Sequence, residues 1–426
     1  MRYTSFARRR TQGEPLNPIL FQDALGGVEQ CLAQQAVMVG GRFVQTKSLV
    51  VERRARRAIY GGFARPTPVD PSLVGPDGHP GTVKNGAFIN IIHHGGHLLE
   101  LDETSPCYEM SVELETIGLW KAGTEKPITL GVHNRRHPTT GALFALAYSV
   151  LEPSVRLHHI DASGKLAQTF AVALAAPTMI HDFVLTEHYI VLLAGPAVFD
   201  WQAARSGQPL LQWRPSLGTR IGIIGLDGSP ATWLEADPFF VFHFANAFER
   251  GSKIFVDYVQ HERLNLGYAA ARRKVPTLHR LDIDLTNRTL NDAQLADMVV
   301  EFPRINDSFS ALPTCYVYLP TLTDTLRITN PPSATFNTML KVDTETGKIA
   351  RHDFGNRIVG EAAFIPRGSN VEDNGYLAIF AFDPASQTSD FVLLDAAHID
   401  AEPVAVLRLP QRVPQGLHGS WLPRGA

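Results

Sequence analysis

Four histidines lie where an apolar, strand-like run meets a small or turn-forming residue, and we interpret them as ligands of one metal ion. They come from four distant parts of the chain: His133, His181, His243 and His418. Neutral imidazoles suit a divalent metal of borderline softness, such as iron, zinc, copper or nickel. The residues therefore predict a four-histidine metal site, and at this point they leave the identity of the metal open.

The strongest local signal is the segment His133-Asn-Arg-Arg-His-Pro-Thr-Thr-Gly141. Two apolar runs that are typical of strands flank it, Ile128–Val132 and Ala142–Tyr148. Pro138 fixes φ and Gly141 permits a positive φ, so the Pro-Thr-Thr-Gly end is a turn in sequence terms. A histidine just ahead of such a turn is well placed at the mouth of a β-fold.

Most of the 16 histidines need not bind metal. His93 and His94 are adjacent, and on a strand they would point to opposite faces, so we expect them to be structural. His158 and His159 fail as a ligand pair for the same reason. A zinc site built from His133 and His137 lacks a second Cys or His pair at the usual spacing.

A metal held by four neutral ligands keeps its full positive charge, so carboxylates should balance it. Such carboxylates accept the outer N–H of each imidazole and fix the orientation of the ring. Three glutamates in apolar surroundings are the best candidates: Glu103, Glu301 and Glu361. The alternative for each of them is a solvated surface charge.

The elements that must position these residues are strands. From Gly41 onward, runs of four to seven residues rich in Ile, Val and Phe alternate with Gly, Pro, Asp and Asn clusters. Three strand–turn–strand units are typical of hairpins, 159–166, 281–290 and 341–349. Such units spread over 426 residues favour an all-β propeller over a two-sheet sandwich. The spacing does not fix the number of blades, and Asn291–Val300 is one short helix candidate.

The composition narrows the class of protein. An apolar fraction of 44%, a charged fraction of 19% and a net charge of -3 describe a folded, soluble chain with no electrostatic reason to bind nucleic acid. Cys31, Cys107 and Cys315 are few and unpatterned, which indicates packing residues in a reducing compartment. No apolar run is long enough for a stable membrane span. We therefore expect a cytoplasmic protein.

In the segments around these histidines and glutamates, the sequence resembles the carotenoid cleavage oxygenases, and within them the lignostilbene dioxygenase branch. The resemblance runs from about Gly41 to Pro423. The segments that carry it are His133–Gly141, His181–Glu187, Leu217–Gly222, Phe242–Glu249, Glu301–Ile305, Gly360–Arg367 and His418–Leu422. Each segment is a weak signal alone, and all of them in the right order make a strong one.

The resemblance implies a seven-bladed β-propeller with a ferrous ion, Fe(2+), on its axis and a cap of loops and short helices over the active site. It implies that His133, His181, His243 and His418 hold the iron, and that three of these ligands donate hydrogen bonds to Glu103, Glu301 and Glu361. It also implies a propeller domain over residues 41–426, preceded by a segment, 1–40, that either has diverged from the family or leaves a closing strand of the ring incomplete.

The chain departs from the lignostilbene branch where that branch grips the phenolic oxygen of its substrate. There the branch has a Lys directly before the first of the three glutamates and a Tyr further upstream. This chain has Asp102 and Thr67 at the matching positions. A carboxylate repels a phenolate but accepts a hydrogen bond from a neutral phenol or alcohol. An exposed loop carboxylate without a substrate contact is the alternative for Asp102.

The function that follows is a non-haem iron(II) dioxygenase that cleaves a C=C bond with O₂ to give two carbonyl products. Its expected partners are O₂ and a stilbene- or phenylpropene-like aromatic alkene, while the oligomeric state stays open. The alternatives are carotenoid or apocarotenoid cleavage at the same site, or an impaired propeller that acts as a binding protein. A zinc hydrolase is disfavoured because four protein ligands close a tetrahedral zinc site.

Overall fold

The computed structural model describes most of the chain from residue 43 onward. The described residues are 20–21, 39–40, 43–62, 68–74, 83–264, 275–326, 335–368, 370–409, 412–413 and 416–422. Thr67, Cys31 and nearly all of the segment 1–40 lie outside the described residues. The prediction of a divergent N-terminal segment therefore stays a prediction.

Antiparallel sheets dominate the described part of the chain. The first three larger sheets contain β3 (Asn90–His94), β4 (His97–Leu101), β5 (Tyr108–Met110) and β6 (Thr116–Leu119); β7 (Asn134–Arg136), β8 (Leu143–Tyr148), β9 (Ser154–Ile160) and β10 (Leu166–Ala173); and β11 (Val184–Leu185), β12 (Tyr189–Ala194), β15 (Thr219–Gly225) and β16 (Thr232–Ala236). The next three contain β17 (Phe240–Arg250), β18 (Lys253–His261), β19 (Thr277–Asp284) and β20 (Thr289–Gln294); β21 (Tyr316–Thr321), β22 (Thr338–Asp343) and β23 (Ile349–Asp353); and β24 (Ile358–Val359), β25 (Ala363–Pro366), β26 (Gly375–Asp383), β27 (Thr388–Asp395) and β28 (Ala405–Arg408).

The remaining elements are short. Two strand pairs stand apart from the larger sheets, β1 (Leu20–Phe21) with β2 (Val39–Gly40) and β13 (Ala197–Phe199) with β14 (Leu211–Trp213). The described helices are α2 (Lys47–Ala55), α3 (Pro71–Val74), α4 (Trp201–Arg205) and the 3₁₀ turns η1 (Pro215–Leu217) and η2 (Asp307–Phe309). None of the described helices is long and apolar enough to cross a membrane.

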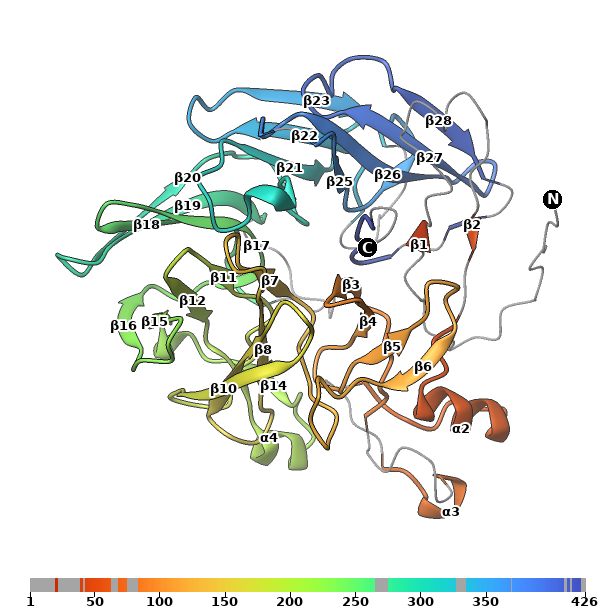
Figure 1. Ribbon diagram of the computed structural model, residues 1–426, viewed down its shortest axis with the longest axis vertical. Coiled ribbons are helices and arrows are strands. Elements are labelled where there is room, and N and C mark those ends of the chain that lie inside the picture. The colour runs from red at the N-terminus through yellow and green to blue at the C-terminus, as the bar shows by residue number, and fades with distance from the viewer. Residues whose placement is uncertain are drawn as a thin grey trace.

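The larger sheets surround a common centre, so the predicted all-β propeller is confirmed (Figure 1). The predicted blade count of seven is wrong, because the described residues form six blades. That count came from resemblance alone, since hairpins without a strict period do not fix how many sheets form. Among the described residues, β1 and β2 form a two-stranded sheet of their own, with Leu20 opposite Gly40.

The hairpins follow from local turn chemistry. Between β9 and β10, the Asp161 carboxylate accepts hydrogen bonds from the backbone N–H groups of Ser163 and Lys165. Gly164 closes this turn at φ +85°, a conformation that favours glycine. The predicted hairpins at 159–166, 281–290 and 341–349 are all present.

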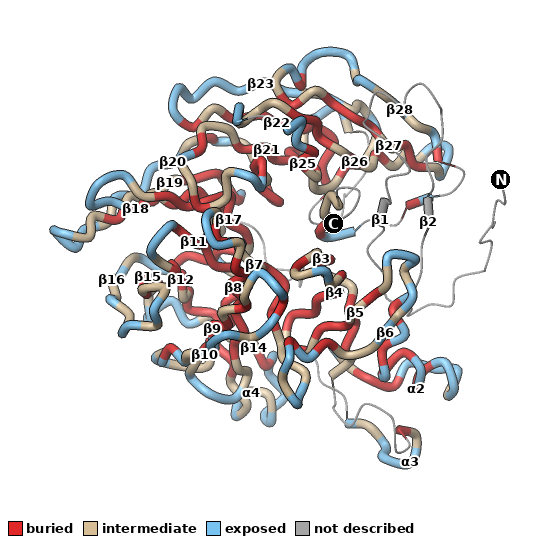
Figure 2. The backbone as a smooth tube through the Cα atoms, in the orientation of Figure 1, coloured by how far each residue is buried: buried red, intermediate tan, exposed pale blue. Residues whose placement is uncertain are grey.

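Burial of both faces of each sheet stabilises the ring. On β18, Val256 and Tyr258 pack toward Val191 and Ile221 of the preceding blade. Val259, on the opposite face of β18, packs toward the following blade. Each such side chain contributes roughly 1.5–3 kcal/mol on burial. Figure 2 shows the buried segments in the inner parts of the blades and the exposed turns at the rim.

Of two expected helical features, one is absent from the described residues and the other stays a prediction. The helix candidate Asn291–Val300 is wrong, because Thr289–Gln294 forms the edge strand β20 against β19. In Figure 1, α2, α3 and α4 lie at the rim, and the expected cap of loops and short helices over the active site stays a prediction. The α2 helix is held at the rim because Val51 packs with Ile59 and Tyr60 outside the ring.

Candidate metal centre

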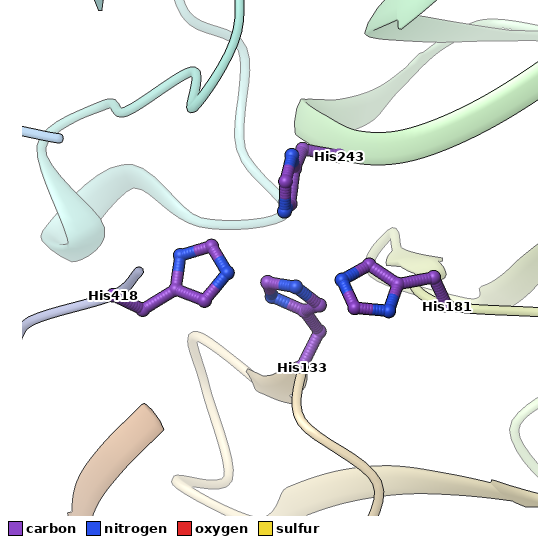
Figure 3. A group of neighbouring side chains, drawn as sticks. All are labelled: His133, His181, His243 and His418. Carbon is purple, nitrogen blue, oxygen red and sulfur yellow. The ribbon is translucent and has the colours of Figure 1, made fainter. Parts of the chain in front are cut away.

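The structure brings the four predicted histidines together. His133 directly precedes β7, His181 lies shortly before β11, His243 is within β17, and His418 follows β28. One nitrogen of each ring lies within 4.8 Å of the corresponding nitrogen of every other ring. The centroid of the His133 ring is 4.9, 5.1 and 4.5 Å from those of His181, His243 and His418. Figure 3 shows the four rings facing one point from four sides.

A buried ion pair holds three of the inner segments in register. The Arg135 guanidinium, on β7, donates to the Asp182 carboxylate at 2.6 and 2.8 Å. Asp182 also accepts the backbone N–H of Phe244 on β17 at 3.0 Å. His181 and His243 directly precede Asp182 and Phe244 in the chain, and His133 lies two residues before Arg135. The contact therefore ties together the backbones that carry three of the four imidazoles.

The three predicted glutamates lie behind three of the imidazoles. Nδ1 of His243 donates to Glu301 Oε2 at 2.5 Å, and Nδ1 of His418 donates to Glu361 Oε1 at 3.0 Å. Nδ1 of His181 is 2.8 Å from Glu103 Oε2, but the contact is not aligned as a hydrogen bond. The alternative of solvated carboxylates is wrong for Glu103 and Glu301, whose residues are buried, and the Glu361 side chain is also shielded.

Two of the ring nitrogens that are not turned toward a glutamate have no hydrogen-bond partner. Nε2 of His133 and Nε2 of His243 are buried and make no hydrogen bond. A buried polar atom without a partner is costly, so a native structure normally gives it a ligand. Since Nδ1 of His243 is engaged by Glu301, its Nε2 lone pair is free to point inward. This arrangement fits a metal ion bound through Nε2.

The electrostatics of the site favour a neutral imidazole at His133 and at His243, but not at His181. Burial lowers the pKa of His133 well below its ordinary value, and the nearby His418, His181 and His243 lower it further. Burial also lowers the pKa of His243, although Glu301 opposes that effect. For His181, burial lowers the pKa, but Glu103 outweighs it and the pKa is raised. Neutral rings can coordinate, so the donor set fits a divalent cation whose charge the glutamates balance.

Aromatic side chains shield the histidines from water. The Phe302 ring lies 5.0 Å from that of His243 and 5.6 Å from that of His418, and the Phe242 ring lies 5.6 Å from that of His181. Phe302 has φ +50°, which is unusual for a bulky residue. In this conformation its backbone N–H donates to Glu301 Oε2 at 2.8 Å. Backbone strain of this kind concentrates at functional sites.

Asp102 is buried, so the alternative of an exposed loop carboxylate is wrong. Its side chain accepts hydrogen bonds from the backbone N–H groups of Gly86 at 2.9 Å and Thr104 at 3.3 Å. Burial raises the pKa of Asp102, and the adjacent Glu103 raises it further. Its role toward a substrate stays a prediction, and the second predicted contact, Thr67, lies outside the described residues.

The other histidine predictions concern side chains outside the group of four histidines His133, His181, His243 and His418, which we call the quartet. His94 is buried, and its Nε2 contacts the backbone oxygen of Asp161 at 2.7 Å, as expected of a structural residue. His158 is also buried and bonds to Thr169. Cys107 packs in an apolar cluster as expected, whereas Cys315 is only half-buried.

Sequence reasoning missed the groups that hold the glutamates from behind. The Tyr148 hydroxyl donates to Glu103 at 2.8 Å, and Nε2 of His261 donates to Glu301 at 2.5 Å. The Arg304 guanidinium lies 3.7 Å from Glu361. Tyr148 ends an apolar strand and His261 ends another, and neither has a distinctive spacing. A polar tip at the inner end of an apolar strand is the one signal that the sequence offered.

Fold and site together define a class: a β-propeller whose inner segments gather four histidines, backed by carboxylates, around one metal-binding point. The family model described as RPE65, retinal pigment epithelial membrane protein, matches residues 23–423 of the chain. The chain therefore belongs to the RPE65/carotenoid oxygenase family.

Individual relatives are distant but similar along most of the chain. The isoeugenol monooxygenase of Pseudomonas nitroreducens is 29% identical over 404 residues, which cover 90% of this chain and 83% of the relative. A carotenoid 9,10(9',10')-cleavage dioxygenase of Crocus sativus is 28% identical over 78% of this chain and 65% of its own length. The crystal structure of Pseudomonas brassicacearum lignostilbene dioxygenase superposes with a TM-score of 0.81 at 27% identity, covering 91% of this chain and 84% of that one.

Proposed function

We propose that this chain is an iron(II)-dependent dioxygenase that cleaves the C=C bond of an aromatic alkene, of stilbene or phenylpropene type, into two carbonyl products. The observation that carries the proposal is the set of four imidazoles that each offer one nitrogen within 4.8 Å of the others, with Nε2 of His133 and Nε2 of His243 buried and without a hydrogen-bond partner. Relatives named isoeugenol monooxygenase and lignostilbene dioxygenase support alkene cleavage and an aromatic substrate.

The residues of the chain have three tasks in this proposal. His133, His181, His243 and His418 would hold the iron, which supplies the redox chemistry that O₂ requires. Glu103, Glu301 and Glu361 keep three of the rings oriented through their Nδ1 atoms and offset the positive charge. Phe242 and Phe302 exclude water from the face of the histidines. No side chain is required as a general acid or base.

Asp102 and Thr67 would face the polar end of the substrate. An ionised Asp102 would repel a phenolate but accept a hydrogen bond from a neutral phenol or alcohol. We therefore expect a higher kcat/KM for substrates whose ring carries a neutral hydroxyl or an ether. Substrates that ionise readily should be poorer.

The proposal is tested by loading the purified protein anaerobically with ferrous iron, measuring bound iron, and adding O₂ with a panel of alkenes. The panel contains stilbenes, isoeugenol-type phenylpropenes and apocarotenals. Aldehyde products from the aromatic alkenes, formed with bound iron near one equivalent, are the expected result. Iron-loaded protein that yields no carbonyl product from any of them contradicts the proposed activity.

A carotenoid or apocarotenoid substrate is the second candidate, because the relative from Crocus sativus is named a carotenoid cleavage dioxygenase. The same panel separates the two, since it ranks kcat/KM for stilbenes against apocarotenals. A binding protein with relic histidines would take up no stoichiometric iron, so metal analysis alone distinguishes it from either enzyme.

A further inference from the structure

Each of the three glutamates has a second oxygen that also needs a donor, because a buried carboxylate left partly unpaired is costly. The structure supplies a different donor for each. Glu103 receives the Tyr148 hydroxyl, Glu301 receives Nε2 of His261, and Glu361 receives the backbone N–H of Gly419 at 3.0 Å. Every carboxylate is thus held from two sides.

We propose, building on the metal centre of the proposed function, that Tyr148 and His261 are positioning residues. They fix the far oxygens of Glu103 and Glu301 and thereby set how His181 and His243 are presented to a bound metal. Neither side chain belongs to the quartet itself, so each acts through a carboxylate.

The contacts of Tyr148 make this role specific. Its hydroxyl donates to Oε1 of Glu103 while Oε2 of the same carboxylate lies 2.8 Å from Nδ1 of His181. Of the two carboxylate contacts, the one to Tyr148 is aligned as a hydrogen bond and the one to His181 is not. Tyr148 therefore determines the rotation of the Glu103 carboxylate. The other carboxylate oxygen, Oε2, then orients the His181 ring.

The position of Tyr148 is itself fixed. Its ring is buried and stacks on Phe199 at a centroid distance of 5.8 Å. Burial raises the pKa of Tyr148 well above its ordinary value, and Glu103 raises it further, so the hydroxyl stays a donor. A rigid neutral donor can hold a carboxylate without removing the charge that balances the metal.

His261 repeats the arrangement at the next histidine. Glu301 accepts from Nδ1 of His243 on Oε2 and from Nε2 of His261 on Oε1, both at 2.5 Å. The His261 ring also packs edge-on against Phe242, at a centroid distance of 5.1 Å. The carboxylate of Glu301 is therefore clamped between two imidazoles, one of which belongs to the quartet.

The test measures binding of Co²⁺ to the metal-free protein by its visible absorption bands, together with the melting temperature without metal. Tyr148→Phe removes only the hydroxyl, and we expect about tenfold weaker Co²⁺ binding and shifted bands. Tyr258→Phe is the matched control, because the buried Tyr258 also donates to a carboxylate, Asp292, at 2.8 Å, outside the quartet. It should change the melting temperature but neither the affinity nor the bands.

His261 provides a second, independent pair of variants should Tyr148→Phe fail to fold. His261→Leu removes the donor to Glu301, and His261→Gln restores an N–H that can reach it. We expect weaker Co²⁺ binding in the first and recovery in the second. His279→Leu is the control, since Nδ1 of His279 bonds to Asp292 at 2.8 Å away from the site.

The outcomes separate this inference from the proposed function. Wild-type protein that binds no Co²⁺ would overturn the metal centre itself. Wild-type protein that binds it, with Tyr148→Phe and His261→Leu matching its affinity and bands, would overturn the positioning role alone. In that second case the two side chains would only stabilise the fold.

Discussion

Glu301 receives hydrogen bonds from two imidazoles, and this double contact makes it the most sensitive of the three carboxylates. Burial would raise the pKa of Glu301, but His243 and His261 outweigh that effect and hold it below the ordinary value. The group is therefore a carboxylate at neutral pH. Its charge is available to one imidazole that faces the metal-binding point and to one behind it.

We predict that Glu301→Gln lowers the affinity for ferrous iron or Co²⁺ about 10- to 100-fold. A glutamine offers one acceptor oxygen and one amide NH₂, so one of the two imidazole N–H groups would face another donor. Metal titration of the apo protein measures the change. Glu249→Gln is the control, because Glu249 contacts His188 at 3.0 Å outside the quartet. Unchanged affinity in Glu301→Gln would contradict the role of this carboxylate.

At the scale of single residues, the sequence predicted the four histidines and three glutamates because their types and flanking runs carry chemistry. The structure brings these seven side chains together. Tyr148, His261 and Phe302 could not be predicted, since their importance depends on which inner strands become neighbours. For Asp102, a sequence position next to Glu103 did not reveal burial, which depends on the backbone of Gly86 packing over it.

At the scale of elements, the inner segments are joined by the ion pair between Arg135 and Asp182. Asp182 is 1% exposed in its side chain, and it also accepts the backbone N–H of Phe183 at 2.7 Å. Removing one partner of such a pair leaves a buried charge without compensation. Loss of either partner should therefore lower the free energy of unfolding of the protein.

We predict that Arg135→Leu lowers the free energy of unfolding by about 3 kcal/mol, because Asp182 loses its counter-ion. Urea denaturation measures this loss. Arg156→Ala is the control, since Arg156 and Glu152 form an exposed pair at 4.0 Å that should contribute less than about 1 kcal/mol. Equal effects of the two substitutions would argue against a special role for the inner pair.

A second prediction at this scale concerns His158 on β9 and acid stability. Burial lowers the pKa of His158 from 6.5 to about 4, and Arg156 adds to the effect. Below pH 6.5 the unfolded chain takes up a proton that the folded chain refuses. Stability that is fully present above pH 6.5 is therefore lost as the pH falls toward 4.

In wild-type protein this group should remove up to about 3 kcal/mol over that range. His158→Gln cannot titrate, yet its amide can still contact Thr169, whose Oγ1 lies 2.7 Å from Nδ1 of His158. The variant should show a flatter dependence of unfolding free energy on pH. Parallel pH profiles for the two proteins would contradict the shift.

Strands were largely predictable because their apolar runs and turn residues are local features. The predicted run Ala142–Tyr148 contains β8 (Leu143–Tyr148). By contrast, Ile128–Val132 is not a strand, and the inner strand β7 begins one residue after His133. The polar run Asn134–Arg136 forms a strand because its backbone pairs with β8 and Arg135 pairs with Asp182.

At the scale of the whole molecule, the C-terminal segment joins the last blade to the first. Trp421 packs against Ile365 and Tyr376 of the last blade, while Leu422 packs with the cluster formed by the first blade. The backbone N–H of His418 donates to the carbonyl of Ile89 at 3.3 Å, just before β3. One segment therefore both bridges the blades and carries His418, a proposed metal ligand.

With the proposed metal bound by His418, ring closure and metal binding should depend on each other. A ligand that binds only the folded state stabilises it by RT ln(1 + [L]/Kd), about 2.7 kcal/mol at a hundredfold excess over Kd. If the segment 416–422 is anchored poorly, His418 faces the metal-binding point for a smaller fraction of the time. A bound metal then adds less to the free energy of unfolding. The number of blades could not be predicted from the sequence, because ring closure depends on contacts between distant segments, such as that of His418 with Ile89.

We therefore predict that Trp421→Ala lowers the free energy of unfolding without metal by about 2 kcal/mol, because a partly buried anchor is lost. It should also reduce the metal-dependent rise in melting temperature, although Trp421 lies three residues beyond His418. Leu417→Ala is the matched control in the same segment, since Leu417 is 42% exposed and should change neither quantity. Suppose that Trp421→Ala is less stable without metal, yet its melting temperature rises as much with Co²⁺ as that of the wild type. This result would contradict the prediction, because ring closure would then not position His418.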